Sequence, residues 1–257
     1  MHTGAVHAGA AHASAVHAGA APAGAGRLEH AAAPGIAPDG RAFAVGFAQL
    51  GWDVALAVGD PAARDAAAAL VAEIEALGRR AVVLVADLSL EDDVRRLVPA
   101  CTAALGRPAC IVSQSEPARA GDARAAGYAP LLDAMARNVA APLALARALH
   151  DATPDQANRD ETLRAAMIHV LDQALFHPAP EPLPHALTQA ALHRAIGAQA
   201  LALAPKVRVA GLVRGRATQP DVLADAACYL ADAAGITGAT LNVDGGEHLA
   251  PPAGGRI

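Results

Sequence analysis

The sequence contains a single lysine, Lys206, and only two tyrosines, Tyr128 and Tyr229. Neither tyrosine is followed by lysine four residues later, so every mechanism that depends on a Tyr-x-x-x-Lys pair is excluded. The three cysteines lie far apart and form no CxxC motif. We therefore expect neither a disulfide framework nor a zinc ribbon, and the natural setting is a reducing cytoplasm.

Long apolar runs and basic clusters are also missing from the sequence. No run reaches the roughly 18 apolar residues of a membrane span, so we expect no membrane association. The formal net charge of −5 argues against a nucleic-acid partner, because nucleic-acid binders usually carry a clustered basic excess. No HExxH motif or paired acid cluster occurs, and no metal site is predicted. With 54% hydrophobic residues, the chain has enough apolar material to bury a sizeable core.

Residues 1–26 form a low-complexity stretch of Ala, Gly and His, in which the histidines recur every five residues. A step of five residues turns a helix by about 140°, so these histidines would not share a face. The stretch has few large apolar groups to offset the entropy lost on ordering. We expect a disordered tail, or translated sequence upstream of the true start, followed by one folded domain over 27–257.

From residue 27 onward, short apolar runs alternate with longer helix-like segments. The runs that we expect to be buried strands are 27–33, 53–58, 81–89, 110–115, 166–173 and 207–213. The segments that we expect to be helices are 40–50, 61–77, 91–105, 128–150, 185–204 and 220–232. Because alternating strands and helices build right-handed βαβ units, we predict the α/β class. The expected fold is a single doubly wound Rossmann-type parallel sheet with helices on both faces.

Four stretches together carry a family resemblance. They are GRAFAVGFAQLGWDVAL (40–56), ADLS (86–89), NVAAPLALARAL (138–149) and ITGATLNVDGGEHL (236–249). Taken jointly, they resemble the short-chain dehydrogenase/reductase (SDR) family over about residues 27–250. The resemblance implies an oxidoreductase that uses NAD(P)H as its cofactor.

The resemblance also implies roles for individual residues. Asn138 leads the long helix and corresponds to the family's catalytic Asn, whereas Asp87 ends the third strand, where the family's Asp approaches the cofactor adenine. The nearest resemblance is to pteridine reductases, which place an Asp thirteen residues before the catalytic Tyr. Here Asp172 stands thirteen residues before His185, and Gln189 occupies the Lys position.

The catalytic pair is where the chain departs most from the family. In the family, Tyr exchanges the substrate proton, while Lys supplies positive charge and binds the nicotinamide ribose. Gln189 keeps the ability to hydrogen-bond ribose hydroxyls but carries no charge. Histidine exchanges protons near neutral pH, so an Asp172–His185 dyad would serve as a proton donor without lysine. The alternative is that the catalytic pair has been lost, and the sequence leaves both open.

The cofactor loop departs from the family as well. The family's turn, Thr-Gly-x-x-x-Gly-x-Gly, is aligned back from Gly40, and Pro34 and Pro38 then hold two of its three glycine positions. Proline has no N–H to donate to pyrophosphate. Asp39 adds a negative charge where phosphate would sit, although Gly35 takes the first glycine's role if the alignment slips by one residue. We expect cofactor binding that is weak or lost.

Three further positions near the implied cofactor differ from the family. Ser-Gln-Ser-Glu at 113–116 replaces Asn-Asn-Ala-Gly, and Arg214-Gly215 replaces Pro-Gly. The very short segment between Arg216 and Pro220 removes the family's substrate-covering loop. Asp60 follows the second strand, where it either suits the ribose diol of NAD or caps the next helix.

The resemblance and the departures leave three functions open. The chain is an active reductase of pterins or other carbonyl-like compounds, a non-enzymatic scaffold, or a barely functional product. The departures favour the last two. The family associates through two helices, here 138–150 and 185–204, so the resemblance implies a homodimer or homotetramer.

Overall fold

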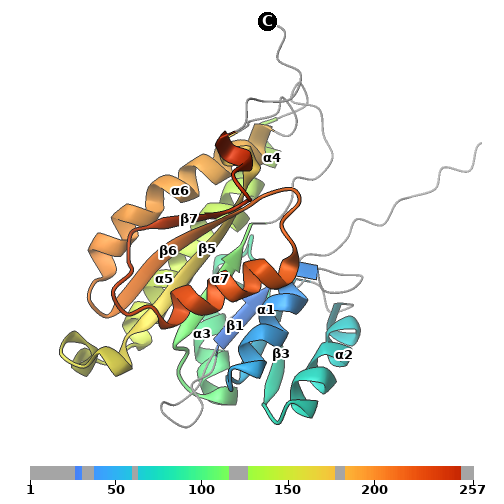
Figure 1. Cartoon of the computed structure of the whole chain (residues 1–257), viewed down its shortest axis with the longest axis vertical. Helices are drawn as coiled ribbons and strands as arrows, with labels where there is room; N and C mark the ends of the chain where they lie inside the picture. Colours follow the sequence, from blue (N-terminus) through green and yellow to red (C-terminus); the bar gives the residue numbers. More distant parts are fainter. Residues whose placement is uncertain (1–26, 31–37, 60–62, 116–126, 177–182, 250–257) are drawn as a thin grey trace, which may run out of the picture.

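The computed structural model describes residues 27–30, 38–59, 63–115, 127–176 and 183–249, and these contain one seven-stranded sheet between two layers of helices (Figure 1). All neighbouring strands are parallel, in the order β3-β2-β1-β4-β5-β6-β7. The strands are β1 (Arg27–His30), β2 (Val54–Val58), β3 (Ala81–Val85), β4 (Cys110–Gln114), β5 (Ala165–Asp172), β6 (Val207–Arg214) and β7 (Thr240–Val243). The predicted doubly wound α/β fold is confirmed.

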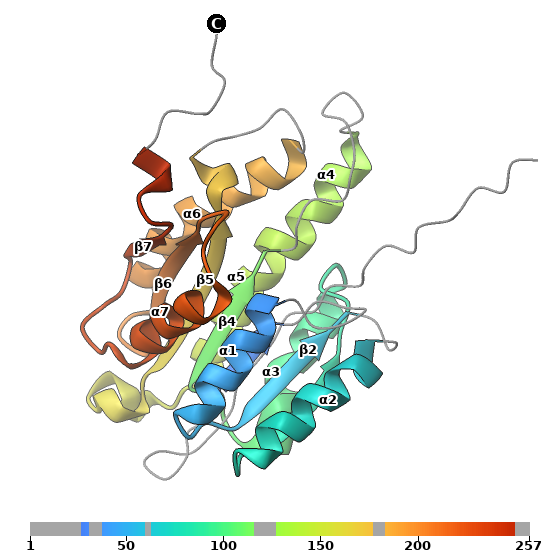
Figure 2. The same cartoon turned by 45° about the vertical axis from the view of Figure 1, so that its right-hand side comes forward.

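Helices cover both faces of the sheet, as the turned view also shows (Figure 2). One face packs against α1 (Pro38–Gln49), α2 (Ala63–Ala76) and α7 (Pro220–Asp232). The other face packs against α3 (Glu91–Leu105), α5 (Ala141–Ala152) and α6 (Leu183–Leu203), while α4 (Tyr128–Met135) leads toward α5. The alternation of faces is the expected result of βα units wound in both directions from the centre of the sheet.

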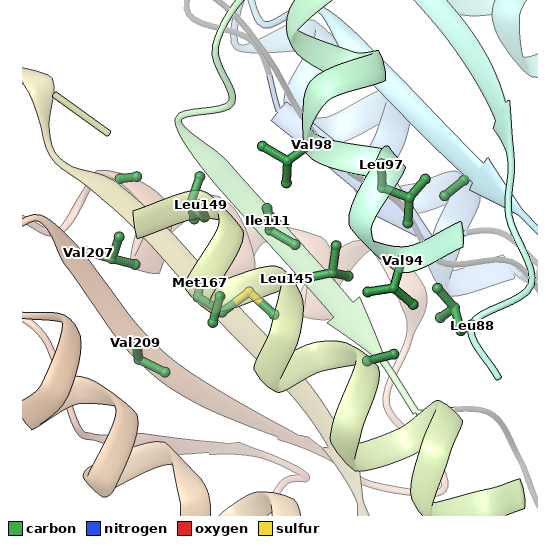
Figure 3. Packing of buried hydrophobic residues seen from close by; sticks show 14 of the residues in the cluster. Leu88, Val94, Leu97, Val98, Ile111, Leu145, Leu149, Met167, Val207 and Val209 are labelled. Carbon is green, nitrogen blue, oxygen red and sulfur yellow. The ribbon is translucent and has the colours of Figure 1, made fainter. Parts of the chain in front are cut away.

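The central strands are buried on both faces, which explains their nearly continuous apolar sequence. In β5, every residue before Asp172 is buried. Figure 3 shows Ile111 and Met167 from the sheet packed beside Leu145 and Leu149 of α5. Full burial of each such side chain contributes about 1.5–3 kcal/mol to the stability of the fold. This apolar layer therefore holds the central strands, and with them their carboxyl ends, in place.

Two predicted elements differ from the structure. The strand expected over 81–89 ends at Val85, and it is only partly buried because it lies at the edge of the sheet. The helix expected over 128–150 is interrupted by a π-helical turn, η2 (Ala136–Ala140), which separates α4 from α5. Such π-turns are rare and concentrate at functional sites, and this one carries Asn138.

The bounds of the other predicted elements differ from those in the structure by a few residues. The segment between α5 and β5 holds two short 3₁₀ turns, η3 (Asp155–Asn158) and η4 (Glu161–Leu163). The connection between β6 and α7 spans only 215–219, as predicted. The tail at 1–26 lies outside the described residues.

The strand order reverses direction between β1 and β4, and in open α/β sheets ligands bind in the crevice at the carboxyl ends of the strands near such a point. Polar residues end three of the strands on the β4 side of that point. They are Gln114 in β4, Asp172 in β5 and Arg214 in β6. The fold therefore brings these three side chains to one edge of the sheet.

Candidate active site at the carboxyl ends of the central strands

The residues at 172 and 185 form a direct hydrogen bond. His185, in the first turn of α6, places Nε2 2.6 Å from Oδ2 of Asp172 at the end of β5. Because an ionised carboxylate only accepts hydrogen bonds, Nε2 carries the proton in this contact. His185 is 6% exposed, and its Nδ1 is buried without a hydrogen-bond partner among the described residues.

Hydrogen bonds set the charge state of Asp172. Burial by itself raises the pKa of this carboxyl, but the hydrogen bond and electrostatic interaction with His185 lower it. The backbone N–H of Ala174, 2.8 Å from Oδ1, and the nearby Arg214 act in the same direction. The pKa of Asp172 therefore lies below its usual range, and the group is a carboxylate at neutral pH.

Gln189 lies one turn after His185 on α6 and is fully buried. Its Oε1 accepts a hydrogen bond from the backbone N–H of Asp172 at 3.0 Å. This contact fixes the amide orientation, so Nε2 is the donor that stays buried without a partner among the described residues. Gln189 thus ties α6 to the end of β5 beside the His185–Asp172 pair.

Asn138 is linked by hydrogen bonds to the same turn of α6. It is buried in the π-turn η2, and its Nδ2 donates to Oγ1 of Thr188 at 3.3 Å. The Thr188 hydroxyl in turn donates to the backbone carbonyl of His185 at 2.7 Å. The structure therefore brings together all four residues that the resemblance placed in catalysis, Asn138, Asp172, His185 and Gln189.

A second polar group lies next to the dyad, at the start of α1. Asp39 is 6% exposed, and its Oδ2 accepts a hydrogen bond from Nε2 of Gln114 at 3.2 Å. The same oxygen is paired with Nη1 of Arg214. Arg214 and Asp172 are register partners in the sheet, so the Asp39–Arg214 pair lies next to the Asp172–His185 pair.

Three of the five residues that the resemblance placed at the cofactor lie in the described part of the chain. Gly40 is buried in the first turn of α1, whereas Gly35 and Asp60 lie outside the described residues. Asp87 uses Oδ1 to accept hydrogen bonds from the backbone N–H and the hydroxyl of Ser89, both at 2.8 Å. That carboxylate closes the turn between β3 and α3.

Gly215 is required for packing after β6. A Cβ atom there would lie 2.8 Å from both Cα and Cβ of Asp244. Because the Cα of Asp244 belongs to the backbone, it cannot move aside as a flexible side chain would. Only glycine therefore allows the segments after β6 and β7 to approach this closely.

A polar cluster around Asp244 was not predicted from the sequence. Its Oδ2 lies 2.7 Å from Nδ1 of His248 and accepts from Nε2 of Gln173 at 2.9 Å. Burial raises the pKa of Asp244, but its hydrogen bonds with His248, Gly246 and Gln173 prevail and lower it to about 2. The signal that would have found this cluster is positional, since Gln173 and Asp244 directly follow β5 and β7, the two parallel strands on either side of β6.

Neither a metal cluster nor a membrane span is found in the described part of the chain. No group of three or more His, Cys, Asp or Glu side chains among those residues is placed to hold a metal ion. None of the helices described is both long and apolar enough to cross a membrane.

Solved structures define the class of this doubly wound protein. It is similar to the FolM alternative dihydrofolate reductase 1 of Brucella canis, complexed with NADP, at 24% identity and a TM-score of 0.74, over 84% of this chain and 92% of that one. The Brucella suis protein, also in complex with NADP, is 25% identical at a TM-score of 0.73, over 82% and 91%. A short-chain type dehydrogenase/reductase from Mycobacterium marinum is 24% identical at a TM-score of 0.73, over 83% and 92%.

No protein-family model and no curated protein matches the sequence. The structural matches cover nearly the whole length of the solved proteins. The chain therefore has the fold of the short-chain dehydrogenases/reductases, as its sequence resemblance indicated.

Proposed function

We propose that this chain is an SDR-fold, oxidoreductase-like protein whose hydride-transfer chemistry is impaired or lost. The observation that carries the proposal is Gln189, a fully buried neutral amide whose Oε1 is bound to the backbone N–H of Asp172. It supplies no positive charge to a neighbouring proton donor. The ancestry that we propose is among NAD(P)H-dependent pterin or carbonyl reductases, supported by the spacing of Asp172 and His185 and by the likeness to the FolM reductases.

We also infer that nicotinamide cofactors bind weakly or not at all. The Asp39 carboxylate at the start of α1 does not fit a pyrophosphate, because it is an acceptor where phosphate oxygens need donors. Pro38, the first residue of α1, lacks an N–H to offer. Each hydrogen bond lost to a charged acceptor weakens binding by about 1.5–3 kcal/mol.

Titration of the purified chain with NADH and with NADPH, followed by calorimetry, tests this inference. We expect no saturable binding at low micromolar concentrations of either cofactor. A dissociation constant in that range would contradict the proposal, and a difference between the two cofactors would then report on the 2′-phosphate.

A second candidate function is a reductase with a rebuilt proton donor, and the 2.6 Å contact between His185 and Asp172 favours it. Nε2 of His185 is engaged by Asp172, so this alternative requires Nδ1, which is buried in the structure, to become accessible and exchange a proton with a substrate oxygen. Asp172 would hold the ring in place and stabilise its charged form. In this alternative, Gln189 positions the end of β5 rather than taking part in chemistry.

A non-enzymatic role would use the scaffold for assembly, as a homodimer or homotetramer through α5 and α6. Leu183, Leu187 and Leu201 are exposed on α6, and Leu201 is 85% exposed. Helical geometry places the three within about 40° of one another around the axis, on the side of α6 that also carries the exposed Arg194. Light scattering of the wild type and of Leu201→Arg tests this role, and a monomeric wild type would contradict it.

A further inference from the structure

The buried carboxylate at the start of α1 is held by side chains from two strands, β4 and β6, that lie far from it in the sequence. Asp39 lies in the first turn of α1, Gln114 ends β4 and Arg214 ends β6. An ionised group that is 6% exposed is costly unless it is paired and hydrogen-bonded. Both donors meet the same oxygen, Oδ2, which is how a single phosphate oxygen would be held.

The sheet fixes the backbones of both donors independently of Asp39. Gln114 pairs in register with Val170 of β5, and Arg214 pairs with Asp172 at the end of that strand. Gln114 must direct Nε2 at the carboxylate, since a carboxylate only accepts, and its Oε1 is buried without a partner among the described residues. Removing the Asp39 charge would leave a guanidinium and an amide donor facing the crevice.

We propose that Arg214 and Gln114 form an anion-binding site whose occupant is the chain's own Asp39 carboxylate, which thereby excludes phosphate-bearing ligands from the crevice. This inference deepens the proposed loss of cofactor affinity by giving it a specific, removable cause. The ligand class is a phosphate or pyrophosphate group. The guanidinium supplies the charge and a planar donor set that suits phosphate oxygens.

Binding of inorganic pyrophosphate, measured by calorimetry, tests the proposal without a nicotinamide. Asp39→Asn removes the charge at nearly constant shape, and Asp39→Ser keeps a side chain that begins helices well. We expect both variants to bind pyrophosphate at least about tenfold more tightly than the wild type. Adding Arg214→Gln to either variant should remove the gain.

Asp151→Asn is the matched control, because it also removes one negative charge that is paired with an arginine. Asp151 pairs with Arg147 on the exposed surface of α5 and involves no residue of α1, so its substitution should leave pyrophosphate binding unchanged. An equal gain in this control would mean that net charge alone is responsible and would overturn the proposal.

Three other results would also overturn it. They are equal binding by wild type and Asp39→Asn, a gain that survives Arg214→Gln, and loss of the fold in both Asp39 variants. The last contradicts the claim that the strands hold the donors by themselves. The proposed cofactor loss is judged separately, since it fails only if the wild type binds NADH or NADPH tightly.

Discussion

His185 Nε2 lies 2.6 Å from Asp172 Oδ2, although the two residues come from different elements and are thirteen positions apart. The contact depends on α6 beginning directly beside the end of β5, where Gln189 ties the helix to the Asp172 backbone. The contact fixes the imidazole ring, engages Nε2 and leaves Nδ1 buried.

Any reductase turnover by the natural chain should depend on His185. His185→Phe should lower it by about 10²–10⁴-fold, the usual contribution of a positioned acid, and Asp172→Asn should lower it less because the ring keeps one hydrogen-bond partner. His193→Phe is the control, because His193 lies on the same helix and is half-buried. Steady-state oxidation of NADPH with ketone or pterin substrates measures the effect, and full activity in His185→Phe would eliminate the dyad.

Restoring the pair as His185→Tyr with Gln189→Lys should not by itself create activity. The Asp39 carboxylate is still paired with Arg214 in this variant. Adding Asp39→Ser to the double variant should then give the first measurable turnover. If the double variant alone is active, the catalytic pair was the missing part and the cofactor loop works as it stands.

His169 should make the fold less stable in mild acid. It is fully buried in β5, with Nε2 2.8 Å from Oε1 of Gln199, and burial lowers its pKa from 6.5 to about 4 despite that hydrogen bond. Between these values the unfolded chain binds a proton that the folded chain does not, so stability falls as pH falls. The loss approaches about 3 kcal/mol near pH 4.

Urea unfolding of wild type and His169→Leu at several pH values isolates this effect. The other titrating groups are shared, so the difference in unfolding free energy between the two proteins should change in favour of the variant from pH 7 to pH 4. A difference that does not vary with pH would show that His169 is not buried in its neutral form.

Gly215→Ala should destabilise the fold by about 1–3 kcal/mol, because the new methyl group would lie 2.8 Å from the Asp244 Cα. Gly197→Ala is the control, since a Cβ there meets nothing within 4 Å and alanine favours the helix. Thermal unfolding of the two variants should therefore shift in opposite directions. Similar shifts would show that the segments after β6 and β7 separate easily.

Local sequence predicted the sheet well, because strands buried on both faces must be apolar throughout, as in 166–173. It failed at 81–89, where an equally apolar run forms an edge strand, because position in the sheet is not encoded in the strand's own pattern. The helix over 128–150 was expected without interruption, since nothing in its composition announces the π-turn at Asn138.

By itself, the sequence determined the fold class and the absence of a Tyr-x-x-x-Lys pair, since periodicity and residue identity are local properties. Only the tertiary structure decided that Asp39 is bound by Gln114 and Arg214. These residues are 75 and 175 positions from Asp39, and they meet because parallel strands end at one edge of the sheet. Pairing across such separations follows from strand order, which the spacing of residues along the chain does not specify.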